Sequence, residues 1–308
     1  MTPALRMPDV VRGAVPGPVR GWLREHLYSD GMALRESWPR FWWDRHVLRR
    51  KPRLHRLVVH VTDHCNLNCA GCTHFSNISE PGFASVEEFE RDMARLAVLF
   101  SAISEIYLLG GEPLLHPDLI EFMRITREQF PESSIKVMTN GVLAHRMEAP
   151  FWEALREYDC TLVCDLYPIA LKVERVDALA AEHGATVEWT ESRDEFFRLP
   201  IDPAGGHDVA DAFERCRWVN NCPILRDGKL YPCAYTAYVD ILKEKFGLDG
   251  MEVTEDDSVS IYAEDDGYTV MDFLVKPVPW CQYCDFDAMV MRPWSRSKHE
   301  AGEWIDAE

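Results

Sequence analysis

The stretch HVTDHCNLNCAGCTHFSN (60–77) holds Cys65, Cys69 and Cys72 in the spacing C-x3-C-x2-C. It overlaps the end of RLVVHVT (56–62), a run rich in β-branched residues that predicts a buried parallel strand. In parallel α/β folds, the residues that perform chemistry lie on loops at the carboxyl ends of the strands. Three thiols on so polar a loop indicate metal ligands, because cysteines without a ligand usually lie in apolar elements.

Two kinds of metal site are compatible with these three cysteines. Three thiolates and a fourth ligand, such as His64 or His74, would complete a zinc site. Three thiolates alone could instead hold three irons of a four-iron cluster and leave the fourth iron open. The spacing of the cysteines by itself does not decide between the two.

The charge of the chain limits its partners. Its 308 residues have a formal net charge of -18, which repels phosphate backbones and anionic membranes, so neither nucleic acid nor a membrane is an expected partner. Residues 1–56 differ, with twelve Lys and Arg against five Asp and Glu. Tryptophans, which favour burial, lie among these charges, so we expect the basic arm to dock on the acidic remainder. They are Trp22, Trp38, Trp42 and Trp43.

No segment of the sequence has the apolar length of a signal peptide or a membrane span. We therefore expect a cytoplasmic protein. In that compartment thiols stay reduced, so clustered cysteines indicate metal binding rather than disulfides.

Strands and helices are predicted to alternate from residue 56 to about residue 190. Segments rich in β-branched residues predict strands, and segments with apolar residues at helical spacing predict helices. This alternation is typical of βαβ units that form a parallel sheet. The predicted strands are 56–62, 104–109, 134–139, 160–166 and 185–190, and the predicted helices are 85–100, 116–130, 150–157 and 171–183.

A second motif follows the second predicted strand, at the same end of the sheet. The segment LLGGEPLLHPDL (108–119) contains Gly-Gly-Glu-Pro. Together with the cysteine loop after the first strand, it resembles the radical S-adenosylmethionine (SAM) superfamily over about residues 56–200. The resemblance implies a partial (β/α)6-type barrel with parallel strands, and it favours an iron–sulfur cluster over zinc.

The resemblance also implies a role for each motif. Cys65, Cys69 and Cys72 would bind three irons of a four-iron–four-sulfur cluster, and SAM would chelate the open iron. Reduction of the cluster would cleave SAM and give a 5′-deoxyadenosyl radical that takes a hydrogen atom from the substrate. The implied SAM contacts are Gly110, Gly111, Glu112 and Pro113.

Two more SAM contacts are expected outside that segment. The family often has an aromatic residue just before the third cysteine, near adenine, but this chain has Gly71 there, so we expect Phe75 to substitute. MTNG (138–141) ends the third predicted strand. Asn140 in this segment is either a SAM contact or simply part of a good Asn-Gly turn.

The regular alternation ends near residue 200, and five more cysteines follow. The spacing from Cys216 through Gly228 to Cys233, with a later C-x2-C pair, resembles the twitch- or SPASM-type extension of radical SAM enzymes. That resemblance implies one auxiliary four-iron cluster on four thiolates. The alternative is a structural zinc site with four cysteine ligands. We assign the four ligands to Cys216, Cys233, Cys281 and Cys284.

The remaining three cysteines have other expected roles. Cys222 is either a neighbour or substitute of the auxiliary ligands, or a free thiol that donates a hydrogen atom to the substrate radical, as an epimerase would need. Cys160 and Cys164 are expected in the core, since residues four apart in a strand face the same side.

The C-terminal region has two further local patterns. Residues 224–232 predict a hairpin that turns at Asp227-Gly228, followed by a helix near 235–246. Residues 249–266 contain eight Asp and Glu and no Lys or Arg, which predicts a solvated loop. We expect three parts in the chain: the basic arm (1–55), the radical SAM core (56–208) and the cysteine-rich extension (209–308).

The expected function is that of a radical SAM enzyme acting on a small molecule in a biosynthetic pathway: a sugar, aminocyclitol, nucleoside or sugar nucleotide. It would need an external electron donor of the flavodoxin or ferredoxin type. One alternative is a peptide maturase that epimerises or crosslinks a ribosomal peptide, although residues 1–56 do not resemble a precursor-recognition module. The other is a non-catalytic metal-stabilised scaffold, which would not need a Gly-Gly-Glu-Pro turn beside an open coordination site.

Overall fold

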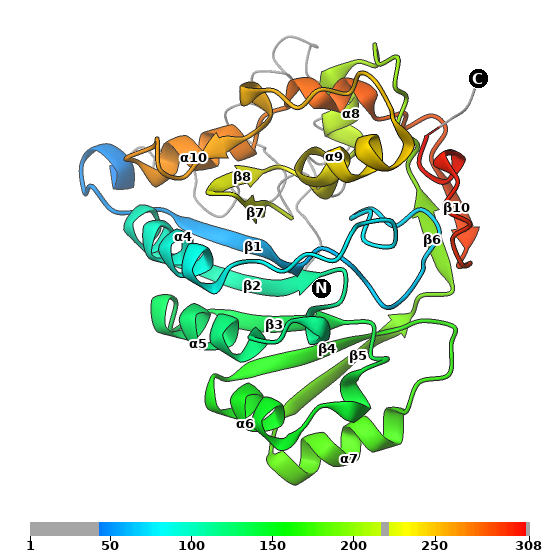
Figure 1. Ribbon diagram of the computed structural model, residues 1–308. Helices are drawn as coiled ribbons and strands as arrows, with labels where there is room; N and C mark the ends of the chain where they lie inside the picture. The colour runs from blue at the N-terminus through cyan, green and yellow to red at the C-terminus, as the bar shows by residue number, and fades with distance from the viewer. Residues whose placement is uncertain (1–42, 217–221, 306–308) are drawn as a thin grey trace, which may run out of the picture.

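The computed structural model describes residues 43–216 and 222–305. At its centre, five parallel strands lie side by side in chain order, as the sequence pattern predicts (Figure 1). They are β1 (Arg53–Thr62), β2 (Ala102–Gly110), β3 (Ser134–Thr139), β4 (Cys160–Leu166) and β5 (Thr186–Ser192). The predicted α/β class with parallel strands is confirmed.

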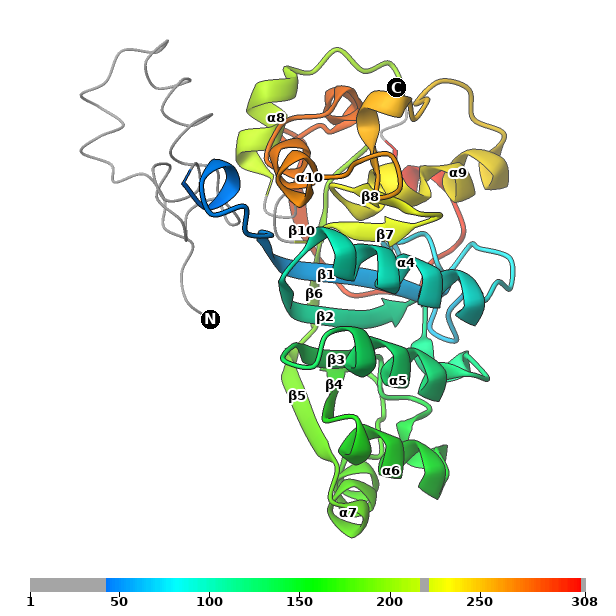
Figure 2. The same cartoon turned by 90° about the vertical axis from the view of Figure 1, so that its left-hand side faces the viewer.

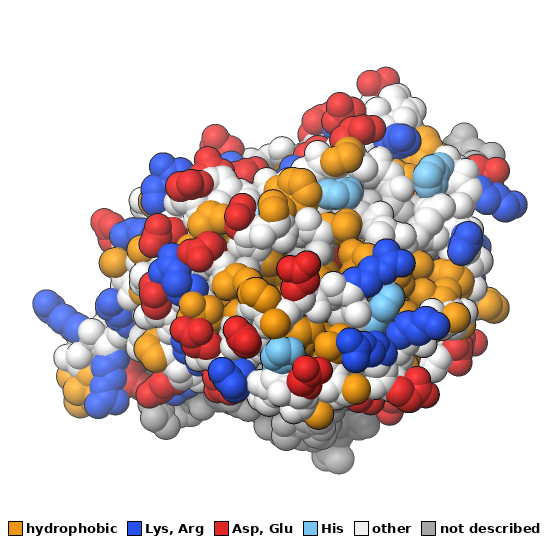
Figure 3. Space-filling model, turned by 60° about the horizontal axis from the view of Figure 1, so that its bottom comes forward, with side chains coloured by type: hydrophobic (Ala, Val, Ile, Leu, Met, Phe, Trp, Pro, Cys, Tyr) orange, Lys and Arg blue, Asp and Glu red, His pale blue; other side chains and the backbone are white. Residues whose placement is uncertain are grey.

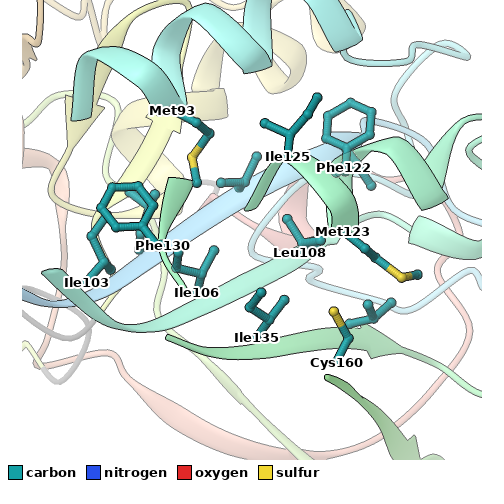
Figure 4. Close-up of a cluster of buried hydrophobic side chains, with 14 of the residues drawn as sticks. Met93, Ile103, Ile106, Leu108, Phe122, Met123, Ile125, Phe130, Ile135 and Cys160 are labelled. Carbon is teal, nitrogen blue, oxygen red and sulfur yellow. The ribbon is translucent and has the colours of Figure 1, made fainter. Parts of the chain in front are cut away.

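Four helices connect these strands and cover one face of the sheet (Figure 2). They are α4 (Val86–Leu99), α5 (Leu119–Gln129), α6 (Ala149–Glu157) and α7 (Val173–His183). Figure 4 shows side chains from α4, α5 and β2, among them Met93, Ile125 and Leu108, in the layer between helices and sheet. Each large apolar side chain buried there contributes about 1.5–3 kcal/mol. Cys160 and Cys164 belong to this core, as predicted.

The sheet continues beyond β1 with strands from the C-terminal part of the chain. β7 (Ile224–Arg226) pairs in parallel with β1, and β8 (Lys229–Tyr231) and β9 (Val259–Ser260) follow as antiparallel neighbours. The sixth parallel strand is therefore β7, which lies beside β1 and not beside β5. It covers backbone groups of β1 that would otherwise form an open edge. One sheet therefore contains strands from both sides of the boundary predicted at residue 208.

The predicted C-terminal hairpin and helix are confirmed. Asp227 and Gly228 have φ angles of 52° and 68°, and a type I′ turn requires positive φ at both central residues. The helix after the hairpin is α9 (Ala234–Phe246). The other elements are α8 (Val209–Arg215), α10 (Gly267–Leu274) and a two-stranded antiparallel sheet of β6 (Glu195–Arg198) and β10 (Val290–Pro293). Within the described ranges, no helix has the length and apolar character needed to cross a membrane.

A second apolar core lies on the face of β1 that the helices α4–α7 leave free. It includes Val58 of β1, whose neighbours in the strand face the first core. Tyr235 of α9 and the fully buried Trp280 and Trp304 pack with it. The cysteine-rich extension and the parallel sheet therefore share an interior.

Most of the basic arm falls outside the described residues, and with it Trp22, Trp38 and Trp42. Trp43 is described and is 52% exposed. Arg45 forms ion pairs with Asp266 at 3.0 Å and with Asp272 at 3.2 Å, at the start of α10 and within it. One link between the arm and the acidic remainder is present. The expected burial of Trp43 is wrong, and the burial of the other three tryptophans stays a prediction. On the face shown in Figure 3, acidic side chains are interspersed with basic ones.

The acidic segment 249–266 is largely exposed, as its charge predicts, but Asp257 is an exception. Asp257 is completely buried. Its Oδ2 accepts hydrogen bonds from the backbone N–H and the hydroxyl of Thr254, both at 2.8 Å, and its Oδ1 accepts one from the backbone N–H of Trp280 at 2.7 Å. These donors compensate the carboxylate for its lost hydration. The bond to Trp280 fixes the acidic segment to the turn that contains Cys281.

We expect Asp257→Ala to lower the free energy of unfolding by about 2–4 kcal/mol, because it leaves buried donors without an acceptor. Urea unfolding followed by circular dichroism measures this. Asp256→Ala removes the adjacent exposed carboxylate and is the matched control, with an expected change within about 0.5 kcal/mol. Equal losses in the two variants would mean that charge, and not the buried contacts, sets the stability of this segment.

Candidate functional site

The cysteine loop and the Gly-Gly-Glu-Pro segment lie against each other where β1 and β2 end. The backbone N–H of Gly111 donates to the carbonyl of Thr62 at 2.7 Å, and that of Glu112 donates to the carbonyl of His64 at 3.1 Å. A Cβ atom at Gly110 would lie 2.2 Å from the Thr62 oxygen, and one at Gly111 would lie 2.0 Å from the His64 oxygen. Any side chain at either position would push the two motifs apart, which explains both glycines.

The side chain of Glu112 joins the end of β2 to the end of β3. It is completely buried. Its Oε1 accepts from the Thr139 hydroxyl at 2.6 Å and from the Leu114 N–H at 3.1 Å, and its Oε2 accepts from the Asn140 N–H at 2.9 Å. Burial raises the pKa of the carboxyl to about 7, although these hydrogen bonds favour the ionised form. Pro113 begins the short 3-10 turn that follows.

Asn140 lies between the end of β3 and the first cysteine. Its Nδ2 donates to Oδ1 of Asn66 at 2.7 Å and lies 3.6 Å from the sulfur of Cys65, while its Oδ1 accepts from the N–H of Val142 at 3.0 Å. Gly141 has a φ of 75°, so the Asn-Gly turn is also present. The turn and the position beside Cys65 are both observed, and the SAM contact stays a prediction.

The protein environment, without a metal, disfavours the thiolate forms of Cys65 and Cys69. Burial raises the pKa of both thiols to about 12, and the charge of Cys72 adds to the increase. Two N–H donors act in the opposite direction: Leu67 donates to Cys65 at 3.3 Å, and the indole of Trp294 donates to Cys69 at 3.1 Å. Both sulfurs are thus prepared to accept hydrogen bonds as thiolates, the form that binds metal.

Cys72 receives backbone N–H donors from residues 74–77, which favour its thiolate, while burial raises its pKa. A positively charged metal centre would remove the repulsion among three neighbouring thiolates, so this donor set fits an iron–sulfur cluster. In the described part of the chain, no three His, Cys, Asp or Glu side chains converge on a single metal ion. A four-iron cluster does not require such convergence, since each thiolate binds a different iron.

The ring of Phe75 is buried, in contrast to its predicted contact with adenine. It has no exposed surface, stacks on Tyr235 with ring centroids 5.7 Å apart, and lies 6.2 Å from the ring of Trp304. Its backbone has a φ of 56°, an uncommon conformation that the packing around the ring maintains. A ring enclosed in this way has no free face for an adenine, so we assign Phe75 to the second core.

Four of the five C-terminal cysteines gather in one region. Burial raises the pKa of Cys284, and the charges of Cys233, Cys281 and Cys216 raise it further. Cys216 follows α8, Cys233 precedes α9, and the other two flank a turn closed by the Cys284 N–H donating to the Cys281 carbonyl at 3.2 Å. Their assignment as the four ligands of one cluster stays a prediction.

Cys222 lies at the edge of that group and has a different neighbour. Burial raises its pKa, while the charge and a hydrogen bond of Arg56 lower it, and Cys233 is the cysteine whose charge reaches it. The connection from Cys222 back to Cys216 runs through residues 217–221, outside the described ranges. Cys222 thus adjoins both the cysteine group and β1.

Charged and aromatic side chains line the face of β1–β3 opposite the helices. Arg56 binds Glu105 at 2.6 Å and lies 4.7 Å over the ring of Tyr107, and Nζ of Lys136 lies 5.5 Å from the same ring. Burial alone would raise the pKa of Glu105, but the hydrogen bond and charge of Arg56 outweigh it and lower the pKa. Sequence reasoning missed this group because its members lie on three strands and belong to no motif.

A cavity of about 630 Å³ opens at the carboxyl ends of β1 and β7. Asp63, two residues before Cys65, lines it together with Asp92 of α4 and Arg226 of β7. Its volume lies in the range typical of small-molecule sites. No sequence pattern indicates this cavity, which forms where β7 joins β1.

Comparison with known families identifies the central part of the chain. The model of the radical SAM superfamily matches residues 59–172. This range begins in β1 and includes the cysteine loop, the Gly-Gly-Glu-Pro segment and Asn140. Residues 59–172 therefore match the radical SAM superfamily, as the motifs predict.

Curated relatives match a limited part of the chain. GTP 3',8-cyclase of Lactiplantibacillus plantarum is 31% identical over 33% of this chain and 31% of its own length. The probable GTP 3',8-cyclase of Methanothermobacter thermautotrophicus is 27% identical over 52% of this chain and 53% of its own length. The chain thus spans between 26% and 53% of the length of the curated relatives it matches.

Solved structures also resemble the chain. The crystal structure of BtrN in complex with AdoMet and 2-DOIA aligns with 18% identity and a TM-score of 0.46, and the alignment covers 76% of this chain and 94% of that one. This likeness is too low to bear on activity.

The raised pKa of Glu112 predicts a pH dependence of stability in the protein without a cluster. The folded state keeps this proton up to about pH 7, while the unfolded state loses it near the ordinary value of 4.5, so stability falls as the pH rises between the two. Full ionisation costs about 3 kcal/mol. Wild type loses this stability as Glu112 ionises, whereas Gln at the same position does not ionise. The difference in free energy of unfolding between wild type and Glu112→Gln, measured by urea unfolding, should therefore shrink between pH 4.5 and pH 8. Glu132→Gln, at an exposed position, is the control, and an unchanged gap would contradict the prediction.

Proposed function

Because residues 59–172 match the radical SAM superfamily, we propose that the chain uses SAM and a four-iron–four-sulfur cluster to remove a hydrogen atom from a small-molecule substrate. The observation that supports this best is the contact among three strand ends: β1 with the cysteine loop, β2 with Glu112, and β3 with Asn140. A structural metal site would need the cysteines but not the glycines that let the second strand end approach them.

In this proposal Cys65, Cys69 and Cys72 hold the cluster, and SAM lies against the turn at Gly110–Glu112. When reduced and in contact with SAM, such a cluster supplies a 5′-deoxyadenosyl radical. The protein keeps the loop rigid: the backbone bond from Gly111 to Thr62 fixes its start, and the Asn140 amide fixes the side chain of Asn66 beside the first sulfur. Glu112 positions these groups without leaving the protein interior.

Two features support a small molecule as the substrate: a sugar, aminocyclitol, nucleoside or sugar nucleotide. The charged group of Arg56, Glu105 and Lys136 offers both donors and acceptors on the inner face of the sheet. The matched relatives are named for GTP, a nucleotide. A peptide substrate is the alternative, and transfer of deuterium from labelled candidates into 5′-deoxyadenosine distinguishes the two.

We propose that Cys216, Cys233, Cys281 and Cys284 hold one auxiliary four-iron cluster. The mutual effect of their charges supports this set. A zinc ion on the same four thiolates is the alternative. The charge and hydrogen bond of Arg56 act on Cys222, which supports a role for its thiol outside this set, near the charged group of the inner face. The role of hydrogen donor remains open to it on that ground.

We further propose a cytoplasmic protein that receives electrons from a flavodoxin- or ferredoxin-type donor. Thiols with metal-ligand spacing require a reducing compartment, and a low-potential cluster requires an external electron source.

We expect anaerobically reconstituted protein to cleave SAM to 5′-deoxyadenosine and methionine when it receives a strong reductant. Replacing Cys65, Cys69 and Cys72 together by Ala should abolish cleavage, which chromatography of the products measures. Cys160→Ala, which removes a thiol from the first core, is the control and should retain cleavage. Undiminished cleavage by the triple variant would refute the assignment of the cluster.

Iron content separates Cys216 from Cys222. We expect Cys216→Ala to retain about one four-iron cluster, because a cluster fully ligated by the protein needs four thiolates. Cys222→Ala should retain both clusters. Loss of a cluster in Cys222→Ala but not in Cys216→Ala would reverse the assignment, and zinc in place of iron in the wild type would replace the auxiliary cluster by a structural zinc site.

A further inference from the structure

Residues 294–304, here called the C-terminal strap, lie across the cysteine loop. The strap follows β10, which stands beside β6 at the edge of the molecule (Figure 1). The N–H of Ala70 donates to the carbonyl of Ser295 at 3.0 Å, and the N–H of Ser297 donates to the carbonyl of Asn68 at 3.1 Å. The Asn68 side chain returns a bond to the carbonyl of Ser297 at 3.1 Å. The loop that holds the cysteines is thus paired with a segment more than 200 residues away along the chain.

The far end of the strap fixes the second half of the loop. The N–H of Gly71 donates to the carboxylate of Glu303 at 3.3 Å. The indole N–H of Trp304, which is 1% exposed, donates to the carbonyl of Cys72 at 2.8 Å. Trp304 therefore donates to the backbone carbonyl of Cys72 and not to the Cys72 sulfur.

Trp294, at the start of the strap, makes a different kind of contact. Its indole N–H donates to the sulfur of Cys69 at 3.1 Å. Its backbone N–H donates to the carbonyl of Asp194 at 2.7 Å, and its ring lies 6.3 Å from that of Tyr167, which stacks on Phe196. The backbone hydrogen bond to Asp194 and the ring contact with Tyr167 both fix the position of Trp294, so the fold sets the direction of its indole N–H.

From this contact we propose that Trp294 is a positioning residue that raises the reduction potential of the cluster by donating its N–H to the Cys69 sulfur. The inference rests on the proposed function, since it requires Cys69 to be a cluster ligand. Hydrogen bonds to cluster sulfurs are among the factors that set the potential of iron–sulfur centres. The reduced cluster has one more negative charge than the oxidised one, so the bond stabilises the reduced state more.

Trp304 supplies the matched control. Both tryptophans belong to the strap, both donate an indole N–H to the cysteine loop, and both contribute a large ring to its packing. They differ in the acceptor, which is a sulfur for Trp294 and a carbonyl oxygen for Trp304. A purely structural role for the strap would make the two replacements equivalent, whereas the proposal makes them different.

The experiment measures the midpoint potential of the SAM cluster in reconstituted protein without SAM, by redox titration followed with electron paramagnetic resonance. All samples have the background Cys216→Ala, so that the signal belongs to the cluster at the cysteine loop. Trp294→Phe keeps an aromatic ring and removes the N–H. We expect it to retain its iron and to lower the equilibrium constant for reduction about tenfold, which is 59 mV for a one-electron couple. Trp304→Phe should leave the potential unchanged.

A second measurement does not require that Trp294→Phe folds and takes up a cluster. Protein labelled with indole-¹⁵N tryptophan should show a ¹⁵N hyperfine coupling to the reduced cluster. The coupling should vanish in Trp294→Phe and persist in Trp304→Phe. If Trp294→Phe takes up no cluster, the coupling in the Cys216→Ala background protein decides: its presence supports the proposal and its absence overturns it.

The other outcomes are equally decisive. Unchanged potentials in both variants would overturn the proposal, and equal shifts in both would assign the effect to packing of the strap and overturn it as well. Failure of the proposed function would look different, because protein with Trp294 intact would then take up no four-iron cluster at the cysteine loop at all.

Discussion

The close approach of two strand ends, β1 at Thr62 and β2 at Gly110, is the constraint on which the candidate site depends. The absence of side chains at Gly110 and Gly111 allows the backbone of one strand end to bond to the other. Glu112 then joins β2 to β3 through Thr139 and Asn140, and the Asn140 amide returns to the cysteine loop. The contacts form a closed circuit through three strands, so a displacement at any one of them would move the cysteines.

The sheet whose first strand leads into the cysteine loop is packed on both faces. The helices α4–α7 hold the sheet from one face, and the second core attaches the C-terminal part of the chain to the other. Tyr235 is buried, and burial together with the charges of Cys284, Cys233 and Cys72 raises the pKa of its hydroxyl, so residues of both cysteine groups act on it. The extension that contains the second cysteine group thus also packs against the loop that contains the first, through the second core.

Local structure could be predicted from the sequence because its causes are local. Alternating or β-branched runs gave the five parallel strands, helical spacing gave α4–α7, and Asp227-Gly228 gave the hairpin through its positive φ angles. The acidic segment was only partly predictable. Its charge indicates solvent exposure, but Asp257 is buried because Thr254 and Trp280 supply donors that composition does not reveal.

The sequence by itself determined the two motifs, their place at the ends of adjacent strands, and hence the match to the radical SAM superfamily, since spacing and order along the chain are sufficient for each. Tertiary structure alone decided what surrounds them. It buried Phe75 in the second core, placed β7 beside β1 and not beside β5, and brought Trp294 to the sulfur of Cys69 across 225 residues. No periodicity or spacing encodes such contacts, because they arise from how two distant segments pack against the same face of a sheet.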